Sequence, residues 1–164
     1  MAGFTAILLA AGRSQRMGEM KALLHWEGST LIKYQVSTLI GAGAKEVIVV
    51  LGHNAELLMS EIKDLARVRC VINKDYDLGR TTSIKVGLNA IDSNDTDCIL
   101  FLNVDQPRNS DVISRLVLSH GNSQRNITIP TYDGKGGHPI IFGMEFIISF
   151  GIIIVSANDL GILI

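Results

Sequence analysis

A loop carrying two glycines, two arginines and a lysine follows the first apolar run of the sequence. The apolar run is Phe4–Leu9, and the loop reads Ala-Ala-Gly-Arg-Ser-Gln-Arg-Met-Gly-Glu-Met-Lys over residues 10–21. Small residues let main-chain N–H groups approach an anion closely, and flanking cations neutralise its charge. The positive charges of Arg13, Arg16 and Lys21 therefore predict a phosphate site in this loop.

The spacing of the loop separates it from two familiar phosphate-binding motifs. It lacks the three closely spaced glycines of a dinucleotide fingerprint. It also lacks the Gly-Lys-Ser/Thr end of a P-loop, because Lys21 follows Met20 and precedes Ala22. The pattern resembles the signature loop of nucleotidyltransferases, in which the lysine reaches the α-phosphate of a nucleoside triphosphate.

A carboxylate stands just after a second apolar run, in the segment Asn-Val-Asp-Gln-Pro over residues 103–107. Asp105 comes two residues past a run that reads as a buried strand, and Pro107 stiffens the backbone beside it. Mg²⁺ prefers hard oxygen ligands and usually takes one or two carboxylates together with substrate phosphates. Asp105 is therefore a candidate metal ligand, and the alternative is that it only opens a turn before Pro107.

Two further segments combine glycine with polar side chains. Gly79 is followed by Arg-Thr-Thr-Ser, so that N–H and O–H donors up to Ser83 gather where a helix is expected to begin. Helix capping is the alternative role for any one of these hydroxyls. The second segment, Gly-Lys-Gly-Gly-His-Pro over residues 134–139, makes Gly137 and His138 candidates for substrate binding, although a histidine beside a proline is also common in purely structural positions.

Composition narrows the range of partners. The 164 residues are 47% hydrophobic and 19% charged, which is typical of one globular domain with a proper core. A net charge of −1 gives no general attraction to nucleic acid or to an anionic membrane.

The apolar stretch Phe146–Ala157 is shorter than the roughly 18 to 20 residues that span a bilayer. Cys70 and Cys98 begin apolar runs and read as small core residues of a reducing compartment, so we expect a cytoplasmic protein.

Short apolar runs alternate with longer amphipathic ones, which is the pattern of a parallel sheet flanked by helices. We expect strands over Phe4–Ala10, Glu46–Leu51, Arg69–Ile72, Cys98–Asn103 and Ile127–Pro130. We expect helices from Ser29 or Thr30 through Ile40, from Asn54 through Leu65, from Thr81 or Thr82 through Ala90, and from Ser110 through Leu118.

These elements predict an α/β fold, a Rossmann-like doubly wound and mostly parallel sheet with helices on both faces. Ligands of such sheets bind beyond the carboxyl ends of the strands. If the first and fourth strands run parallel, the loop of Lys21 and the turn of Asp105 emerge at the same edge. A cationic cradle and an acid at one edge indicate a metal–triphosphate site.

The motifs, in this order, resemble the MobA-like nucleotidyltransferases that complete the molybdenum cofactor, over roughly residues 4–145. The likeness is strongest at Leu-Ala-Ala-Gly of residues 9–12, at Arg-Met-Gly of residues 16–18 and at Lys21. A second alanine before one glycine is typical of the cytidylyl-transferring branch, and the segments at Asp105, at Gly79 with Ser83, and at Gly137-His138-Pro139 agree with it. An extra methyl at Ala11 would also narrow a pocket that otherwise admits a purine.

The resemblance implies a fold of the nucleotide-diphospho-sugar transferase type and a reaction. The terminal phosphate of a molybdopterin-type substrate attacks the α-phosphate of CTP in line, and pyrophosphate leaves. It implies that Arg16 and Lys21 hold phosphates, that Asp105 holds Mg²⁺, and that the product serves a molybdenum hydroxylase such as a xanthine dehydrogenase. The nucleotide-binding residues carried over are Leu9, Ala10, Ala11, Gly12, Arg13, Arg16, Lys21, Gly79, Ser83 and Asp105.

Two departures from the family pattern keep alternatives open. Arg80 stands where the family usually has methionine. We expect one domain over residues 1–164 whose end is truncated or atypical from about 147, with Asp159 a poor candidate for the second metal carboxylate. The alternatives are a guanylyl- or other nucleotidyltransferase, and a non-catalytic accessory protein that carries the cofactor. A dinucleotide-binding domain is disfavoured because its ribose-binding acid is missing after Leu51.

Overall fold

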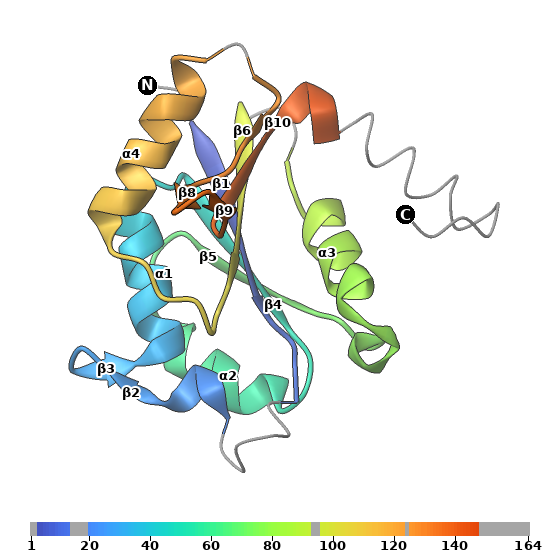
Figure 1. Ribbon diagram of the computed structural model, residues 1–164. Helices are drawn as coiled ribbons and strands as arrows, with labels where there is room; N and C mark the ends of the chain where they lie inside the picture. Colours follow the sequence, from blue (N-terminus) through green and yellow to red (C-terminus); the bar gives the residue numbers. More distant parts are fainter. Residues whose placement is uncertain (1–2, 14–19, 93–95, 124, 148–164) are drawn as a thin grey trace, which may run out of the picture.

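The central sheet of the computed structural model has six strands among the residues that the structure describes, which are 3–13, 20–92, 96–123 and 125–147. Their spatial order is β5-β4-β1-β6-β10-β7 (Figure 1). The strands are β1 (Phe4–Ala10), β4 (Glu46–Leu51), β5 (Val68–Ile72), β6 (Cys98–Asn103), β7 (Ile127–Thr128) and β10 (Ile140–Gly143). β5, β4, β1 and β6 are parallel, and β10 is antiparallel to both of its neighbours.

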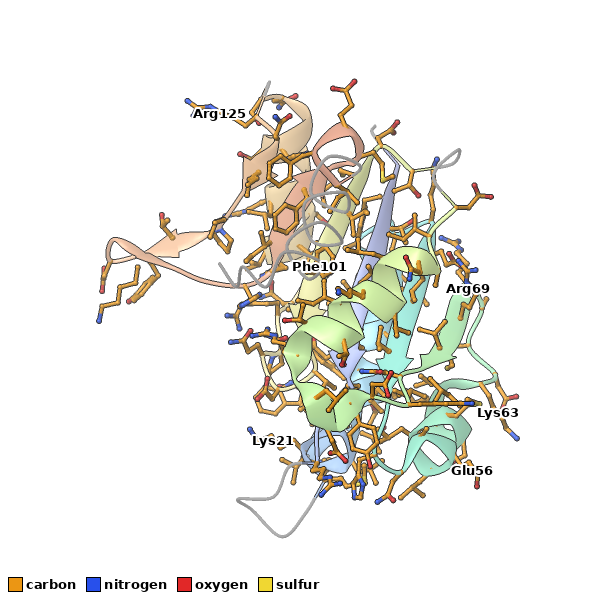
Figure 2. The ribbon with its side chains drawn as sticks, turned by 90° about the vertical axis from the view of Figure 1, so that its right-hand side faces the viewer. Lys21, Glu56, Lys63, Arg69, Phe101 and Arg125 are labelled. Atoms are coloured by element: carbon orange, nitrogen blue, oxygen red, sulfur yellow. The ribbon has the colours of Figure 1, made fainter. Side chains whose placement is uncertain are left out.

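Helices cover both faces of the sheet. α1 (Leu31–Gly41), α2 (Ala55–Ile62) and α4 (Ser110–Gly121) lie on one face, and α3 (Arg80–Asn89) lies on the other (Figures 1 and 2). Two 3₁₀ turns, η1 (Lys21–Leu23) and η2 (Tyr76–Leu78), lie in the connections that follow β1 and β5. Two small hairpins also form, β2 (His25–Trp26) with β3 (Ser29–Thr30), and β8 (Thr131–Tyr132) with β9 (Lys135–Gly136), and residues 144–147 are helical. The doubly wound, mostly parallel α/β fold expected from the sequence is confirmed.

Two cores form, one on each face, because side chains alternate along a strand. In β1, Phe4, Ala6 and Leu8 pack into the core beneath α1, α2 and α4. Ile7 points the other way, into the core beneath α3. Side chains of β1, β4 and β6 are buried on both faces, which is why these strands read as continuous apolar runs.

α3 packs unusually close to the sheet at Gly87. A Cβ at this position would lie 2.8 Å from Ile7 Cγ2 and 3.1 Å from Val50 Cγ2. The absence of a side chain therefore lets the helix backbone settle onto β1 and β4.

Strand prediction was accurate for the parallel part of the sheet and weaker beyond it. β1, β4 and β6 have the expected bounds, and β5 begins one residue earlier, at Val68. The strand expected over Ile127–Pro130 ends at Thr128. β10 was not predicted as a strand, because a short apolar run such as Ile140–Phe142 carries no period by which to recognise it.

The helix bounds needed corrections at both starts and ends. α3 begins at Arg80 rather than at Thr81 or Thr82, since Gly79 with φ 114° ends the preceding turn. Asn109 rather than Ser110 caps α4, its side chain accepting a hydrogen bond from Val112 N at 3.0 Å. α2 ends at Ile62 instead of Leu65.

None of the helices in the described ranges is long and apolar enough to cross a membrane. The expected atypical end, from about residue 147, and Asp159 fall mainly in 148–164, outside the described residues. The single-domain boundary therefore stays a prediction.

Candidate active site

A cavity of about 460 Å³ opens at the carboxyl ends of β1 and β6. The chain winds from β1 outward to β4 and β5 and then returns to β6 on the other side of β1. The cavity therefore lies at the topological switch point, where ligands of doubly wound sheets bind. Its lining residues are Leu9, Ala10, Ala11, Gly12, Met20, Lys21, Ala22, Leu58, Tyr76, Arg80, Ser83, Asn103, Val104, Asp105 and Gln106.

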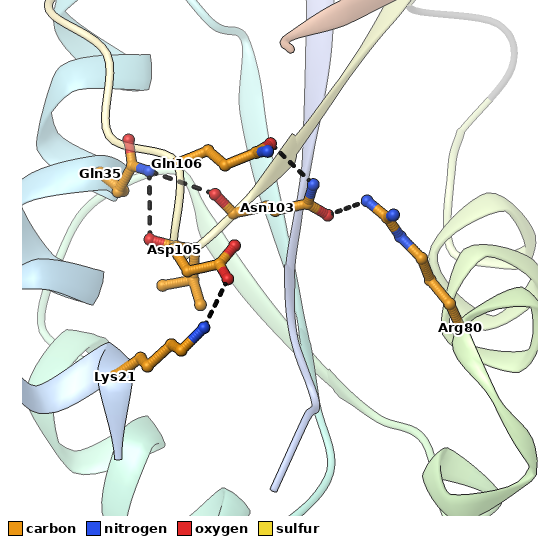
Figure 3. A network of polar contacts seen from close by, with 7 residues as sticks. Lys21, Gln35, Arg80, Asn103, Asp105 and Gln106 are labelled. Atoms are coloured by element: carbon orange, nitrogen blue, oxygen red, sulfur yellow. Dashed lines mark hydrogen bonds and ion pairs between the residues drawn. The ribbon is translucent and has the colours of Figure 1, made fainter. Parts of the chain in front are cut away.

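Lys21 and Asp105 meet in this cavity. Lys21 Nζ donates to Asp105 Oδ2 at 3.0 Å (Figure 3), and the two side chains are 36% and 42% exposed. Lys21 is the first residue of η1, and Asp105 lies in the turn after β6. The expectation that the loop and the acid emerge at one edge of the sheet is met.

A hydrogen-bonded turn after β6 fixes the direction of the Asp105 side chain. Val104 N donates to Leu9 O at 3.1 Å, so β6 stays attached to β1 one residue beyond the strand. Gln106 N then donates to Asn103 O at 3.1 Å, which closes a turn with Val104 and Asp105 at its two central positions. A carboxylate in such a turn has a fixed direction with respect to the sheet.

The end of β1 and the first residues after it form the part of the cavity wall beside this turn. Leu9, Ala10, Ala11 and Gly12 all line the cavity. Ala11 O accepts from His53 N at 3.2 Å, which ties the loop to the end of β4. Around Gly12, an added Cβ would meet nothing within 4 Å, so its backbone faces open space that a ligand can enter.

The start of α3 supplies a second polar wall. Ser83 is 6% exposed, lines the cavity, and accepts from Asn73 Nδ2 at 2.9 Å. Asn73 Nδ2 also donates to Thr82 Oγ1 at 2.8 Å. Arg80 reaches over the sheet and its guanidinium donates to Asn103 Oδ1 (Figure 3). Gly79, although predicted to contact nucleotide, does not line the cavity and serves as the turn before α3.

Arg13 lies at the rim rather than in the cavity. Its guanidinium pairs with Asp77 at 2.5 Å and stands 5.6 Å from the centre of the Tyr76 ring. These contacts tie the loop after β1 to η2, whose first residue, Tyr76, lines the cavity. Arg16 lies outside the described residues.

Gly137 and His138 do not reach the main cavity. Gly137 N donates to Pro130 O at 2.9 Å, within the β8–β9 region. His138 lines a second, mostly apolar cavity of about 330 Å³, which shares Leu9, Arg80 and Asn103 with the first. Burial lowers the pKa of His138, and the positive charges of Arg80 and Arg108 lower it further. The expected substrate-binding segment thus lies beside an adjoining cavity.

The donor set suits a divalent cation shared with a substrate. Among the described residues, no group of three or more His, Cys, Asp or Glu side chains could hold a metal by itself. Asp105 offers one hard carboxylate in a cavity that also holds Lys21. This fits the mode in which Mg²⁺ is held by one carboxylate together with phosphate oxygens.

Sequence reasoning did not include four cavity residues with polar or aromatic side chains among the site residues, which are Tyr76, Arg80, Asn103 and Gln106. Asn103 and Gln106 flank Asp105, so the same strand-end argument could have included them. Tyr76 follows β5, and its place near the carboxyl ends of the parallel strands was the available signal.

A family comparison decides what this site belongs to. The model of the MobA-like NTP transferase domain matches residues 6–150. The chain belongs to the MobA-like NTP transferase family. The resemblance inferred from the motifs is confirmed, and the cavity at the switch point is the candidate active site of a nucleotidyltransferase domain.

Curated relatives of this MobA-like chain carry different names. It is 37% identical over 146 residues to nicotine blue oxidoreductase of Paenarthrobacter nicotinovorans, covering 84% of this chain and 69% of that protein. It is 28% identical over 141 residues to molybdenum cofactor cytidylyltransferase of Escherichia coli strain K12, covering 86% and 70%. Among solved structures, a nucleotidyl transferase from Methanothermobacter matches with a TM-score of 0.75 and 27% identity, over 88% of this chain and 73% of that one.

Proposed function

We propose that this MobA-like NTP transferase moves a CMP group from CTP onto the phosphate of a molybdopterin-type acceptor, with release of pyrophosphate. An oxygen of the acceptor phosphate forms a bond to the α-phosphorus of CTP, and the bond from that phosphorus to the pyrophosphate oxygen breaks. No covalent enzyme intermediate is required, so the protein contributes positioning and charge neutralisation.

The observation that carries this proposal is the meeting of Lys21 and Asp105, 3.0 Å apart in a cavity at the switch point. Lys21 supplies a cation for the α-phosphate, where negative charge builds up during transfer. Asp105 supplies the carboxylate for Mg²⁺, which when bound neutralises phosphate charge and orients the triphosphate.

The loop after β1 receives the nucleotide in this proposal. Leu9 to Gly12 line the cavity, and the space beside Gly12 lets main-chain N–H groups approach phosphate. Arg16, although outside the described residues, belongs to the same loop and is assigned to the phosphates with Lys21. Ser83 offers a hydroxyl at the opposite wall.

The preference for CTP rests on the size of Ala11 and on a relative. Ala11 lines the cavity and is 5% exposed, and in this proposal its methyl disfavours a larger purine base. The relative from Escherichia coli is named a cytidylyltransferase.

In this proposal the acceptor binds at the adjoining cavity. His138 and Arg80 line that cavity, with Gly137 just before His138, and Arg80 also reaches the main one. A cation at the junction suits an acceptor that brings its own phosphate to the α-phosphate of CTP. A molybdenum hydroxylase in the cytoplasm is the proposed recipient of the product.

Two measurements test the proposal. Thermal unfolding with each of CTP, GTP, ATP and UTP plus Mg²⁺ is expected to show the largest stabilisation with CTP, because a ligand that binds only the folded state raises its stability. Pyrophosphate release with CTP, Mg²⁺ and the pterin acceptor is then expected above the rate without acceptor.

Other outcomes of these measurements point to the alternatives. Stronger protection by GTP would make the protein a guanylyltransferase. Binding of CTP and acceptor without pyrophosphate release would make it a carrier of the cofactor and refute the catalytic role.

A further inference from the structure

Gln35 is a buried polar residue in the middle of α1. Its side chain is 0% exposed, and its helix neighbours Ile32, Val36 and Leu39 belong to the core beneath the sheet. Glutamine is seldom fully buried, since its amide loses hydrogen bonds to water. A fully buried glutamine in this core therefore calls for a specific partner.

Its partners are two consecutive main-chain carbonyls. Gln35 Nε2 donates to Asn103 O and to Val104 O, at 3.3 Å in each case (Figure 3). Both N–H bonds of the amide are thus used. Gln35 Oε1 is buried and has no hydrogen-bond partner in the structure. The opposite orientation of the amide would place this oxygen against two carbonyls, so the donor must face the strand end.

The two carbonyls belong to the turn that carries Asp105. Asn103 O also accepts from Gln106 N, which closes the turn. On the opposite face of the sheet, the guanidinium of Arg80 holds Asn103 Oδ1, and Asn103 Nδ2 donates to Gln106 Oε1 at 2.9 Å (Figure 3). The turn is therefore held from α1 and from α3 at once.

Gln35 does not line the cavity. The two hydrogen bonds that Gln35 donates both end on the turn after β6, and the next residue along that turn is Asp105. Polar side chains that fix the backbone or the ligand next to a metal are known to set its affinity.

We propose that Gln35 is a positioning residue for Asp105, holding the carbonyls of Asn103 and Val104 so that the carboxylate points at the metal of a bound nucleoside triphosphate. This inference rests on the proposed function, because it assigns Asp105 to that metal. Burying Gln35 Oε1 without a hydrogen-bond partner lowers the stability of the fold. The two bonds that Gln35 donates hold the turn after β6 in one geometry.

The test compares Gln35→Met with Val36→Ala by calorimetric titration of CTP, with and without Mg²⁺. Methionine has a similar volume and no donor, and Val36 is a fully buried neighbour whose truncation disturbs the same helix. We expect Gln35→Met to weaken Mg²⁺-dependent CTP binding by roughly 10- to 100-fold. CTP affinity without Mg²⁺ should stay unchanged, and Val36→Ala should alter neither quantity.

The two proposals fail in different ways. If wild-type protein binds no triphosphate with Mg²⁺, the proposed function falls and this inference falls with it. If wild-type binding depends on Mg²⁺ but Gln35→Met retains that dependence, or Val36→Ala loses it equally, only the role of Gln35 is refuted. If Gln35→Met does not yield folded protein, Gln35→Asn replaces it; this variant keeps a buried amide but shortens its reach, and the same selective loss is expected.

Discussion

Lys21 Nζ lies 3.0 Å from Asp105 Oδ2, although the two residues are 84 positions apart in the sequence. The ammonium and the carboxylate neutralise each other across the cavity. A triphosphate with its metal would offer each of them a new partner, a phosphate for Lys21 and a cation for Asp105. The ammonium of Lys21 and the carboxylate of Asp105 thus already lie where a phosphate and a metal ion of the substrate complex are expected.

Replacing Lys21 with alanine should abolish most of the transferase activity. A unit charge about 4 Å from a developing negative charge is worth ~4 kcal/mol at an effective dielectric near 20. This corresponds to about a thousandfold in rate. Steady-state pyrophosphate release measures the effect, and Lys63→Ala, at the exposed end of α2, serves as the control. Near-normal activity of Lys21→Ala would remove Lys21 from the mechanism.

Asp105→Asn should lose metal-dependent nucleotide binding while remaining folded. Ion pairs between partly exposed side chains contribute only about 0–1 kcal/mol to stability, and this pair is 36% and 42% exposed. Calorimetry with CTP and Mg²⁺ is expected to show no metal-dependent gain in affinity, with an unfolding midpoint close to that of the wild type. Asp133→Asn, in the exposed turn between β8 and β9, is the matched control. Unaltered metal dependence in Asp105→Asn would exclude Asp105 as the ligand.

Ala11→Gly should shift the nucleotide preference toward purines. The substitution removes the methyl of a residue that lines the cavity, and discrimination by one methyl-sized group is worth about 1–3 kcal/mol. We therefore expect the ratio of GTP to CTP affinity to rise by roughly tenfold or more. Competition binding with both nucleotides measures this ratio. A ratio equal to that of the wild type would show that Ala11 does not select the base.

Gly87→Ala should destabilise the fold despite the better helix propensity of alanine. The propensity gain is about 1 kcal/mol, whereas forcing an extra methyl into a packed core costs about 1–3 kcal/mol. The new Cβ would stand 2.8 Å from Ile7 and 3.1 Å from Val50, so overpacking should win. Urea denaturation gives the free energy of unfolding, and a more stable variant would contradict the close packing of α3.

Stability should fall in mildly acidic solution because of His120. This side chain is 8% exposed, its Nδ1 lies 2.8 Å from Thr128 Oγ1, and burial lowers its pKa below the ordinary 6.5. The unfolded chain then binds a proton more readily than the folded one. The contribution of His120 to stability is complete above about pH 6.5 and is lost as the pH falls from there toward the folded pKa.

Urea denaturation at pH 7.5 and 5.5 measures this loss. His120→Gln should show a smaller decrease between the two conditions than the wild type. His25→Gln, at an exposed site, should retain the full decrease. An equal decrease in His120→Gln and the wild type would exclude His120 as its source.

The sequence predicted the placement of Lys21 and Asp105 because only strand identity and direction were needed. β1 and β6 are covered on both faces, their apolar runs are unmistakable, and parallel strands end at one edge. The contact of Arg80 with Asn103 could not be predicted in this way, since it depends on where α3 crosses the sheet. The burial of Gln35 could not be predicted either, because it depends on where α1, which packs against β4 and β1, brings this side chain to the end of β6.

β1 pairs with β6 so that Leu9 lies opposite Asn103. The position of Asp105 relative to Lys21 therefore depends on the register of these two strands. A slip of one residue would shift the acid by about 3.3 Å and turn its side chain to the other surface. A misaligned chain could still be compact and helical yet would bring no carboxylate to the lysine. Transferase activity would therefore distinguish the correct register of β1 and β6 from a slipped one. Secondary-structure content would not, because both forms contain the same helices and strands.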